Sequence, residues 1–289
     1  MQDKSSISPK TQFCALIGNP VGHSMSPAIH NAAFTATGQD FVYVACQVED
    51  VTGALAGMRA LGNFRGMSVT IPHKIEVMEH VDEIAEVDKA IGSINTVICE
   101  NGKLIGLGTD GPGALKALTD ADVDFTGKTV LMLGCGGAAR AIAFTLANRT
   151  ELAELVMLDI DENFLQGLTA DLQQKTDKQI SSAVLSDASI AAAMTKSDVI
   201  VHCTPIGMHP KEDATLVPKD LFRPGQVVFD AVYNPLETRL LREAKTKGCT
   251  TVSGVEMFIN QAILQFEQFT GIDAPTDVMR EVVLKELGL

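Results

Sequence analysis

The chain has 289 residues, of which 46% are hydrophobic and 20% are charged. This composition is ordinary for a globular protein and argues against wholesale disorder, and the length suggests two domains. The formal net charge of −13 repels nucleic acid and anionic membrane surfaces over most of the exterior. We therefore expect small-molecule partners, with no nucleic acid and no membrane among them.

The cysteines and the N-terminal residues indicate the cellular compartment in which the protein is expected. Six cysteines are scattered without a C-x-x-C pair, which argues against a disulfide framework and against a zinc site. The N-terminal stretch MQDKSSISPKTQ contains no apolar run of the kind found in a signal peptide. These features predict a cytoplasmic protein with reduced cysteines and no metal.

The first part of the chain, from Phe13 to about Asp110, predicts an α/β domain, because short β-like runs alternate with stretches of helical spacing. The β-like runs are FCALIG (13–18), FVYVAC (41–46), GMSVT (66–70), INTVIC (94–99) and KLIGLGT (103–109). The helical stretches are SPAIHNAAFTATG (26–38), VTGALAGMRALG (51–62) and PHKIEVMEHVDEIAEVDKAIG (72–92).

Polar residues gather in two motifs of this part. Ser24 and Ser26 precede a proline and a helical run, an arrangement in which one hydroxyl caps the helix and the other faces outward. Ser68 and Thr70 lie two apart on a predicted strand and therefore face the same side. Lys74 follows a proline-initiated turn, where a lysine is usually only a solvated surface charge.

The second part, from Thr129, predicts a buried parallel sheet, because short apolar strands are separated by helices. The helical pattern of residues 254–271 indicates an amphipathic helix that packs back onto the first domain. The predicted strands are TVLMLG (129–134), LVMLDI (155–160), ISSAVL (180–185), DVIVHCT (198–204), QVVFDAVY (226–233) and CTTVSG (249–254).

A glycine-rich turn joins the first of these strands to a helix. Gly134, Gly136, Gly137 and Ala138 stand where glycines allow a tight turn and bring a pyrophosphate close to the amides of a helix N-terminus. A plain turn is the competing interpretation of such a short motif. We interpret Cys135, within this turn, as a small residue in a crowded place, because no base lies beside it in sequence.

An acidic residue follows at the spacing typical of dinucleotide sites. Asp159 lies 22 residues beyond Gly137, at the end of the next strand, where a carboxylate accepts bonds from the adenine-ribose hydroxyls and repels a 2′-phosphate. The position favours NAD over NADP. An ordinary acidic helix N-terminus formed by Asp159, Asp161 and Glu162 is the alternative.

A further loop follows the strand at 198–201. Thr204, Pro205, Gly207 and Met208 stand where a turn at the carboxyl edge of the sheet is expected, and open α/β sheets bind ligands at that edge. A loop without a binding role is the competing interpretation.

Eight motifs in this order resemble the shikimate/quinate dehydrogenase family, and the resemblance covers roughly residues 13–270. It implies α/β architecture with two domains: a substrate domain of residues 1–113 plus 254–289, and a Rossmann-type doubly wound parallel sheet of residues 114–253. The motifs are GNPVGHSMSPAIHN, SVTIPHK, GSINTV, GTDGPG, GCGGAARA, CTPIGM, DAVYNPLETRLL and GVEMFINQA.

Members of this family reversibly oxidise shikimate to 3-dehydroshikimate, or quinate to 3-dehydroquinate, with a nicotinamide cofactor and without a metal. The resemblance implies that Lys74 and Asp110 form the acid–base pair at the reacting hydroxyl. For the substrate it implies Ser24 and Ser26 at the carboxylate, Ser68, Thr70, Asn95 and Gln261 at the ring, and Tyr233 lining the cleft. For the cofactor it implies Gly134, Gly136, Gly137, Ala138, Asp159, Thr204, Pro205, Gly207, Met208 and Gly254.

Three departures from the family pattern refine these expectations. Ser68 replaces a common asparagine and Gly108 replaces another, which shortens polar side chains near the ring. Asp159 and Ile160 occupy the positions where NADP-specific relatives carry asparagine and arginine. We therefore expect NAD as cofactor, with NADP less favoured, in an enzyme that accepts quinate as well as shikimate.

Two other classes of function remain open at this stage. One is a related oxidoreductase that acts on a folate or an aminated shikimate analogue. The other is a regulator that senses NAD or quinate without turnover, although the presence of both Lys74 and Asp110 argues against it. The sequence is compatible with a monomer or a homodimer.

Overall fold

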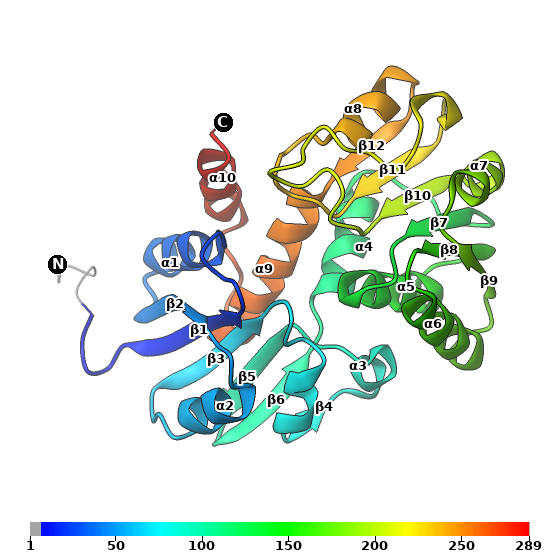
Figure 1. The fold of residues 1–289 in the computed structure, drawn as a ribbon. Coiled ribbons are helices and arrows are strands. Elements are labelled where there is room, and N and C mark those ends of the chain that lie inside the picture. Colours follow the sequence, from blue (N-terminus) through cyan, green and yellow to red (C-terminus); the bar gives the residue numbers. More distant parts are fainter. Residues whose placement is uncertain (1–6, 289) are drawn as a thin grey trace. The chain divides into compact units, whose positions relative to one another are not determined.

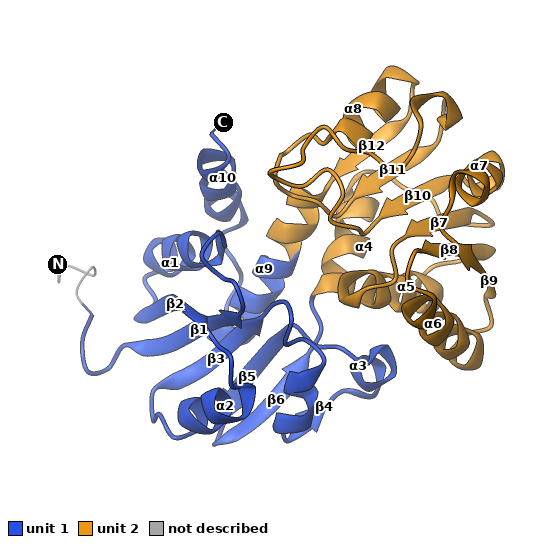
Figure 2. Cartoon of the chain, in the orientation of Figure 1, with its two compact units in different colours: residues 1–109, 261–289 blue, residues 110–260 orange. Residues whose placement is uncertain are grey.

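The computed structural model describes residues 7–288. The chain divides into two compact units, unit 1 (1–109 and 261–289) and unit 2 (110–260), as Figure 2 shows. Helix α9, Gly254–Thr270, contributes residues to both units. The division lies a few residues from the expected domain limits at 113 and 253, which stay a prediction.

Unit 1 is built on a six-stranded mixed sheet with the order β2-β1-β3-β5-β6-β4 (Figure 1). Strands β1, β2 and β3 are mutually parallel, whereas β5 runs antiparallel to both β3 and β6. Asn101 and Gly102 connect β5 to β6 with positive φ angles, as a two-residue hairpin turn requires. The strands are β1 (Gln12–Gly18), β2 (Phe41–Gln47), β3 (Phe64–Val69), β4 (Glu83–Ile84), β5 (Thr96–Glu100) and β6 (Lys103–Leu107).

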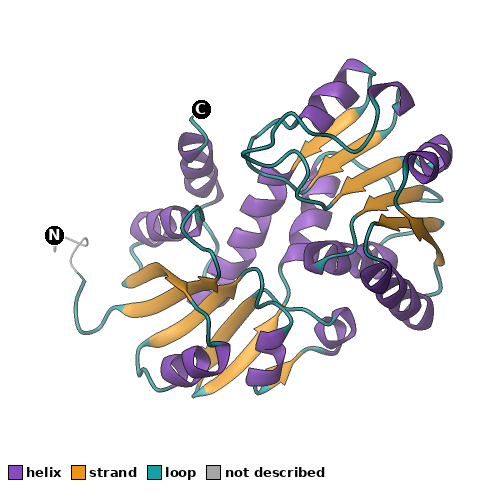
Figure 3. Cartoon of the chain, in the orientation of Figure 1, coloured by secondary structure: helices purple, strands orange, loops and turns teal. Residues whose placement is uncertain are grey.

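Helices cover both faces of this sheet. On one face, Leu55 of α2 packs into a cluster with Ile17 of β1 and Met67 of β3. On the other face, the Phe34 ring of α1 lies 5.5 Å from that of Phe266 in α9. The alternation along β1 and β3 therefore places two apolar layers on opposite sides of one sheet. Figure 3 shows the helices that cover its two faces. The helices are α1 (Ser26–Thr37), α2 (Val51–Arg59), α3 (Glu86–Ile91) and α10 (Thr276–Glu286), besides α9.

One predicted element of unit 1 is wrong. The helical spacing of stretch 72–92 predicts a helix, but the stretch forms a 3₁₀ helix at Glu76–His80, strand β4 and the short helix α3. The Asp82 amide donates to the Leu104 carbonyl at 2.8 Å, and Asp82 Oδ2 accepts from the Leu104 amide at 2.7 Å. Pairing with β6 thus breaks a segment whose local propensity favours a helix.

Unit 2 contains six strands that are all parallel, in the order β12-β11-β10-β7-β8-β9. This is the doubly wound order in which the chain starts at the centre and reverses once, so the predicted fold class is confirmed. The strands are β7 (Thr129–Leu133), β8 (Glu154–Asp159), β9 (Gln179–Val184), β10 (Val199–His202), β11 (Val227–Asp230) and β12 (Thr250–Ser253). The helices are α4 (Asp110–Asp120), α5 (Gly137–Arg149), α6 (Glu162–Lys175), α7 (Asp187–Lys196) and α8 (Arg239–Thr246), with a 3₁₀ helix at Lys219–Leu221.

Across residues 7–288, none of the helices combines the length and apolar character that crossing a membrane requires. All six cysteines carry free thiols.

Candidate functional site

The glycine turn of unit 2 connects β7 to α5. Gly134 has a φ of +100°, and a Cβ atom there would lie 2.9 Å from the Cys203 carbonyl oxygen, so only glycine fits. Gly136 precedes α5 and supplies no side-chain cap, and Cβ atoms at Gly136 and Gly137 would meet nothing within 4 Å. The turn therefore combines a tight backbone with an open, uncapped helix N-terminus, the local geometry that receives a phosphate group.

Asp159 lies at the end of β8, beside this turn. Its Oδ2 accepts from the Cys135 amide at 2.5 Å, and its Oδ1 accepts from the Asp161 amide at 2.8 Å. The carboxylate thus holds the glycine turn against the next strand. The acidic helix N-terminus also exists, because Asp161 caps α6 by accepting from the Asn163 amide at 2.9 Å. Ile160, between the two acids, is 78% exposed.

A buried polar network lies behind the loop that carries Thr204. The Asp230 carboxylate is fully buried and accepts from His202 Nδ1 at 2.8 Å and from Thr238 Oγ1 at 2.5 Å. His202 Nδ1 donates to this carboxylate, and Thr204 Oγ1 lies 2.5 Å from the other ring nitrogen, Nε2. The network connects the ends of β10 and β11 and orients the Thr204 hydroxyl. His202, Asp230 and Thr238 are not among the residues predicted from the sequence.

The other predicted cofactor residues have different structural roles. A Cβ at Gly254 would lie 2.5 Å from the Val232 carbonyl oxygen, so this glycine allows α9 to start against the chain that leaves β11. Gly207 has a φ of +88° in the loop after β10, and Met208 is exposed. Pro205 lies in the same loop, and Ala138 lies in the first turn of α5.

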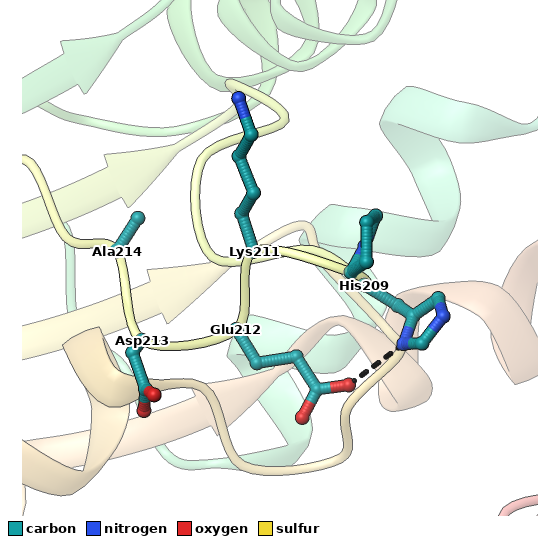
Figure 4. Close-up of a pocket in the computed structure, with 6 residues that line it drawn as sticks. His209, Lys211, Glu212, Asp213 and Ala214 are labelled. Atoms are coloured by element: carbon teal, nitrogen blue, oxygen red, sulfur yellow. Dashed lines mark hydrogen bonds and ion pairs between the residues drawn. The ribbon is translucent and has the colours of Figure 1, made fainter.

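A surface hollow of about 650 Å³ follows this loop and is shown in Figure 4. His209 Nδ1 lies 3.0 Å from Glu212 Oε1 across it. One chain segment lines the hollow, which therefore lacks the converging elements of a binding pocket. The lining residues are His209, Pro210, Lys211, Glu212, Asp213 and Ala214.

Asp110 is the first residue of α4 and is buried in unit 2. Burial raises the pKa of the nearby Cys203 thiol, and the carboxylates of Asp230 and Asp110 add to that effect. Cys203 also touches the glycine turn, since its carbonyl oxygen faces Gly134. Within unit 2, Asp110 therefore lies close to the glycine turn and to the start of the Thr204 loop.

Lys74 lies in unit 1, on the loop after β3. The Ile94 amide donates to the Lys74 carbonyl at 2.9 Å, which attaches this loop to the chain leading into β5. The adjacent His73 is buried, and its Nε2 donates to the Val48 carbonyl at 2.8 Å. The Lys74 backbone is therefore held from two sides, and its side chain is half-buried.

Ser26 is the first residue of α1, and Ser24 lies two residues before it. The Ser26 amide donates to Ser24 Oγ at 3.2 Å, so Ser24 stabilises the first turn although the formal N-cap, Met25, supplies no side-chain bond. Ser24 is half-buried and Ser26 is buried. The expected serine cap is therefore wrong, because Met25 holds the cap position and Ser24 bonds to the first turn from one residue before it. The second serine, Ser26, is buried and does not face outward.

Two of the predicted ring contacts, Asn95 and Gln261, meet at one place in unit 1. Asn95 Oδ1 accepts from the Thr109 amide at 2.7 Å, and Asn95 Nδ2 donates to Thr109 Oγ1 at 2.9 Å. Gln261 Oε1 lies 3.4 Å from Asn95 Nδ2. Thr70 follows β3 on the side that faces Gly18 of β1, and its amide donates to the Ile17 carbonyl at 2.9 Å.

Ser68 is buried and bonded to residues that the sequence analysis missed. It accepts from the Tyr43 hydroxyl at 2.7 Å and donates to Gln265 Oε1 at 2.8 Å. Gln265 lies one helical turn beyond Gln261 on α9, so the same helix face carries both amides. That four-residue spacing was visible in the sequence and is the signal that could have found Gln265.

Tyr233 lies after β11 in unit 2. Its ring stacks on Phe258 of α9 at 4.8 Å and 16°, and burial raises the pKa of its hydroxyl. The structure thus gathers Asn95, Thr109 and Gln261 in unit 1, and Gly134, Asp159 and Thr204 at the carboxyl edge of the sheet in unit 2. Lys74 and Asp110 belong to different units, and their pairing stays a prediction.

Comparisons with known proteins place the chain among dehydrogenases. Residues 16–97 match the model of the shikimate dehydrogenase substrate binding domain, and residues 254–284 match that of the shikimate 5′-dehydrogenase C-terminal domain. A shikimate dehydrogenase (NADP(+)) of Moorella thermoacetica is 40% identical, over 98% of this chain and 96% of that protein.

Two solved structures have the same fold. Shikimate 5-dehydrogenase of Listeria monocytogenes, in complex with shikimate and NAD, has a TM-score of 0.90 at 33% identity and covers 96% of this chain and 98% of its own. Quinate dehydrogenase of Corynebacterium glutamicum, in complex with NAD, has a TM-score of 0.89 at 28% identity and covers 95% and 99%.

Proposed function

The chain belongs to the shikimate dehydrogenase family, and we propose from this membership that it reversibly oxidises the ring hydroxyl of shikimate to the ketone of 3-dehydroshikimate, with NAD(P) as the hydride acceptor. The glycine turn is the observation that carries the proposal. It joins the central strand of a doubly wound sheet to an uncapped helix, with a carboxylate beside it. These groups suit a dinucleotide, because the backbone amides donate hydrogen bonds to the pyrophosphate and the carboxylate accepts hydrogen bonds from the ribose hydroxyls.

We infer that Gly134, Gly136, Gly137 and Ala138 hold the diphosphate. In this proposal Thr204, Pro205, Gly207, Met208 and Gly254 line the nicotinamide half of the site. The cofactor supplies the hydride acceptor when it is bound. The His202–Asp230 network then has a role in keeping the Thr204 hydroxyl in place.

NAD is the preferred cofactor in this proposal, although the Moorella thermoacetica relative is named for NADP(+). Asp159 would repel a 2′-phosphate at the ribose, and Ile160 offers no positive charge to attract one. The Listeria and Corynebacterium structures both contain NAD, which supports the same choice.

For the chemistry we propose that Lys74 and Asp110 form the acid–base pair that transfers the proton of the reacting hydroxyl. Hydride transfer from a carbinol carbon requires this proton to leave at nearly the same time. Lys74 accepts it in the oxidation direction and returns it in the reduction direction, and Asp110 is its partner. The substrate contacts in this proposal are Ser24 and Ser26 at the carboxylate, Ser68, Thr70, Asn95 and Gln261 at the ring, and Tyr233 at the edge of the site.

We further propose that the protein accepts quinate as well as shikimate. Ser68 and Gly108 stand where asparagine is common in the family, so two longer polar side chains are missing, and a quinate dehydrogenase is among the structural neighbours. We also propose a cytoplasmic enzyme, a monomer or a homodimer, with only small-molecule ligands. The negative net charge and the free thiols support this view.

Kinetics with Lys74→Ala test the proposal. Wild-type protein should form NADH from NAD with shikimate, and Lys74→Ala should lower kcat by about 10²–10⁴-fold, as expected for a general acid–base group. NADH binding, followed by its fluorescence, should not change. Lys89→Ala is the matched control, because Lys89 is an exposed lysine of the same unit that pairs with Glu86. Near-normal turnover of Lys74→Ala would refute its role, and tight NAD binding without turnover of either acid would favour the regulator.

A further inference from the structure

A chain of hydrogen bonds joins buried polar side chains of four elements in unit 1. The Tyr43 hydroxyl of β2 donates to Ser68 Oγ of β3 at 2.7 Å, and Ser68 donates to Gln265 Oε1 of α9 at 2.8 Å. Gln265 Nε2 donates to Thr96 Oγ1 at 2.9 Å, and Thr96 donates to Asn95 Oδ1 at 3.1 Å, where β5 begins. Gln265 and Thr96 are 1% and 0% exposed. Because both side chains are shielded from solvent, they affect a bound ligand only through the residues to which they are bonded.

Two main-chain groups set the direction of these bonds. The Thr109 amide can only donate, and it lies 2.7 Å from Asn95 Oδ1, so the other end of this side-chain amide is the nitrogen. The Asn95 carbonyl can only accept, and it lies 3.3 Å from Gln265 Nε2, so Gln265 Oε1 faces Ser68. Each amide thus has one orientation. With Oδ1 held by Thr109 and Thr96, Asn95 Nδ2 donates to Thr109 Oγ1 at 2.9 Å and directs its other hydrogen toward Gln261 Oε1 at 3.4 Å.

Three titratable groups close to this chain, His30, Tyr43 and Cys14, are uncharged at neutral pH, and Arg65 is the charged group near them. Burial lowers the pKa of His30, on α1, to about 3, and its ring stacks on Tyr43 at 4.5 Å. Burial raises the pKa of Tyr43, and also that of the Cys14 thiol on β1. Arg65 of β3 bonds to the Phe269 carbonyl at the far end of α9. The orientation of the amides therefore does not change with pH near neutrality.

We propose that Thr96 and Gln265 are positioning residues that hold the oxygen end of the Asn95 amide inward, so that Asn95 meets the substrate ring as a hydrogen-bond donor. The inference rests on the proposed function, because only there does Asn95 contact the substrate. Its chemical consequence is specific. The substrate atom opposite Asn95 is a hydrogen-bond acceptor, such as the oxygen of a ring hydroxyl or of the ketone product.

Two substitutions at Thr96 distinguish the contribution of its hydroxyl group from that of its side-chain shape. Thr96→Val keeps the shape and removes the hydroxyl, whereas Thr96→Ser keeps the hydroxyl. We expect Thr96→Val to raise KM for shikimate about fivefold, the effect of one neutral hydrogen bond, with kcat and KM for NAD little changed. Thr96→Ser should behave like the wild type. A wild-type KM in Thr96→Val, or an equal rise in Thr96→Ser, overturns the inference.

Gln265→Glu adds a second test, the pH dependence of KM for shikimate, which a purely structural role of Gln265 would not change. An ionised glutamate only accepts, whereas a protonated one both accepts from Ser68 and donates to Thr96, as glutamine does. Burial raises the pKa of a carboxyl group, so the KM of the variant for shikimate, divided by that of the wild type, should fall as pH falls from about 9 to about 6. Gln268→Glu, on the exposed side of α9, should give a constant ratio. A constant ratio in Gln265→Glu contradicts the inference.

These results distinguish the two proposals. Normal wild-type turnover with unchanged KM in Thr96→Val overturns the positioning role and leaves the proposed function standing. Absence of NADH or NADPH formation by the wild-type protein, with shikimate and with quinate, overturns the proposed function and the positioning role together.

Discussion

Replacing Asp159 by alanine is expected to narrow the preference for NAD over NADP. Two unit charges 4 Å apart interact by about 1 kcal/mol in bulk water and by about 4 kcal/mol near a protein surface. Asp159 is half-buried, so solvent screens part of its field, and we take about 2 kcal/mol for its repulsion of a 2′-phosphate. That repulsion corresponds to roughly 30-fold in the ratio of kcat/KM values for the two cofactors.

The same substitution also removes a structural contact. Asp159 accepts from the Cys135 and Asp161 amides, so alanine releases the glycine turn and should raise KM for both cofactors. A disturbed turn weakens the binding of NAD and NADP alike. The ratio of kcat/KM with NAD to kcat/KM with NADP therefore isolates the effect of the Asp159 charge.

The assay is steady-state reduction of NAD and of NADP by shikimate for wild type, Asp159→Ala and Asp161→Ala. Asp161→Ala removes the same charge two residues away and also the cap of α6, so it should cost about 1 kcal/mol of stability. It should change the cofactor ratio by less than about threefold, because its carboxylate points into α6 and the field of a more distant charge is screened. An unchanged ratio in Asp159→Ala would show that the discrimination lies elsewhere.

Three further outcomes follow from the geometry of unit 2. Gly134→Ala should lower the free energy of unfolding by about 2 kcal/mol, because it forces a side chain into a positive-φ turn, whereas Gly136→Ala should leave urea unfolding unchanged and raise KM for NAD; the reverse pattern would contradict the proposed diphosphate site. Thr238→Val should cost about 3 kcal/mol in the same measurement, since it removes a bond to the buried Asp230 carboxylate and the cap of α8, and Thr238→Ser should recover most of it. Burial raises the pKa of Cys135 to about 12, so iodoacetamide at pH 8 should leave this thiol unmodified, as read by mass spectrometry of its peptide, and rapid labelling would contradict this.

Local patterns in the chain were sufficient for the architecture of unit 2, and they predicted the glycine turn that the structure contains. Continuous apolar strands between helices indicated a parallel sheet, and the glycines after Leu133 and the acid at 159 occur at sequence spacings that the fold itself imposes. The helix predicted for stretch 72–92 is wrong for the opposite reason. Its helical spacing is local, but Asp82 pairs with Leu104, and no pattern within the stretch reports such a partner.

Tertiary structure decided which polar side chains act together. Gln265 joins Ser68 to Thr96 across a separation of 197 and 169 residues, and His202 meets Asp230 across 28. Hydrogen bonds of this kind depend on the register of neighbouring strands and on the packing of a helix on a sheet, which arise only when the whole unit folds. The kinds of residue and their order belong to the sequence, whereas the direction in which each amide or hydroxyl points is set by neighbours distant in the chain.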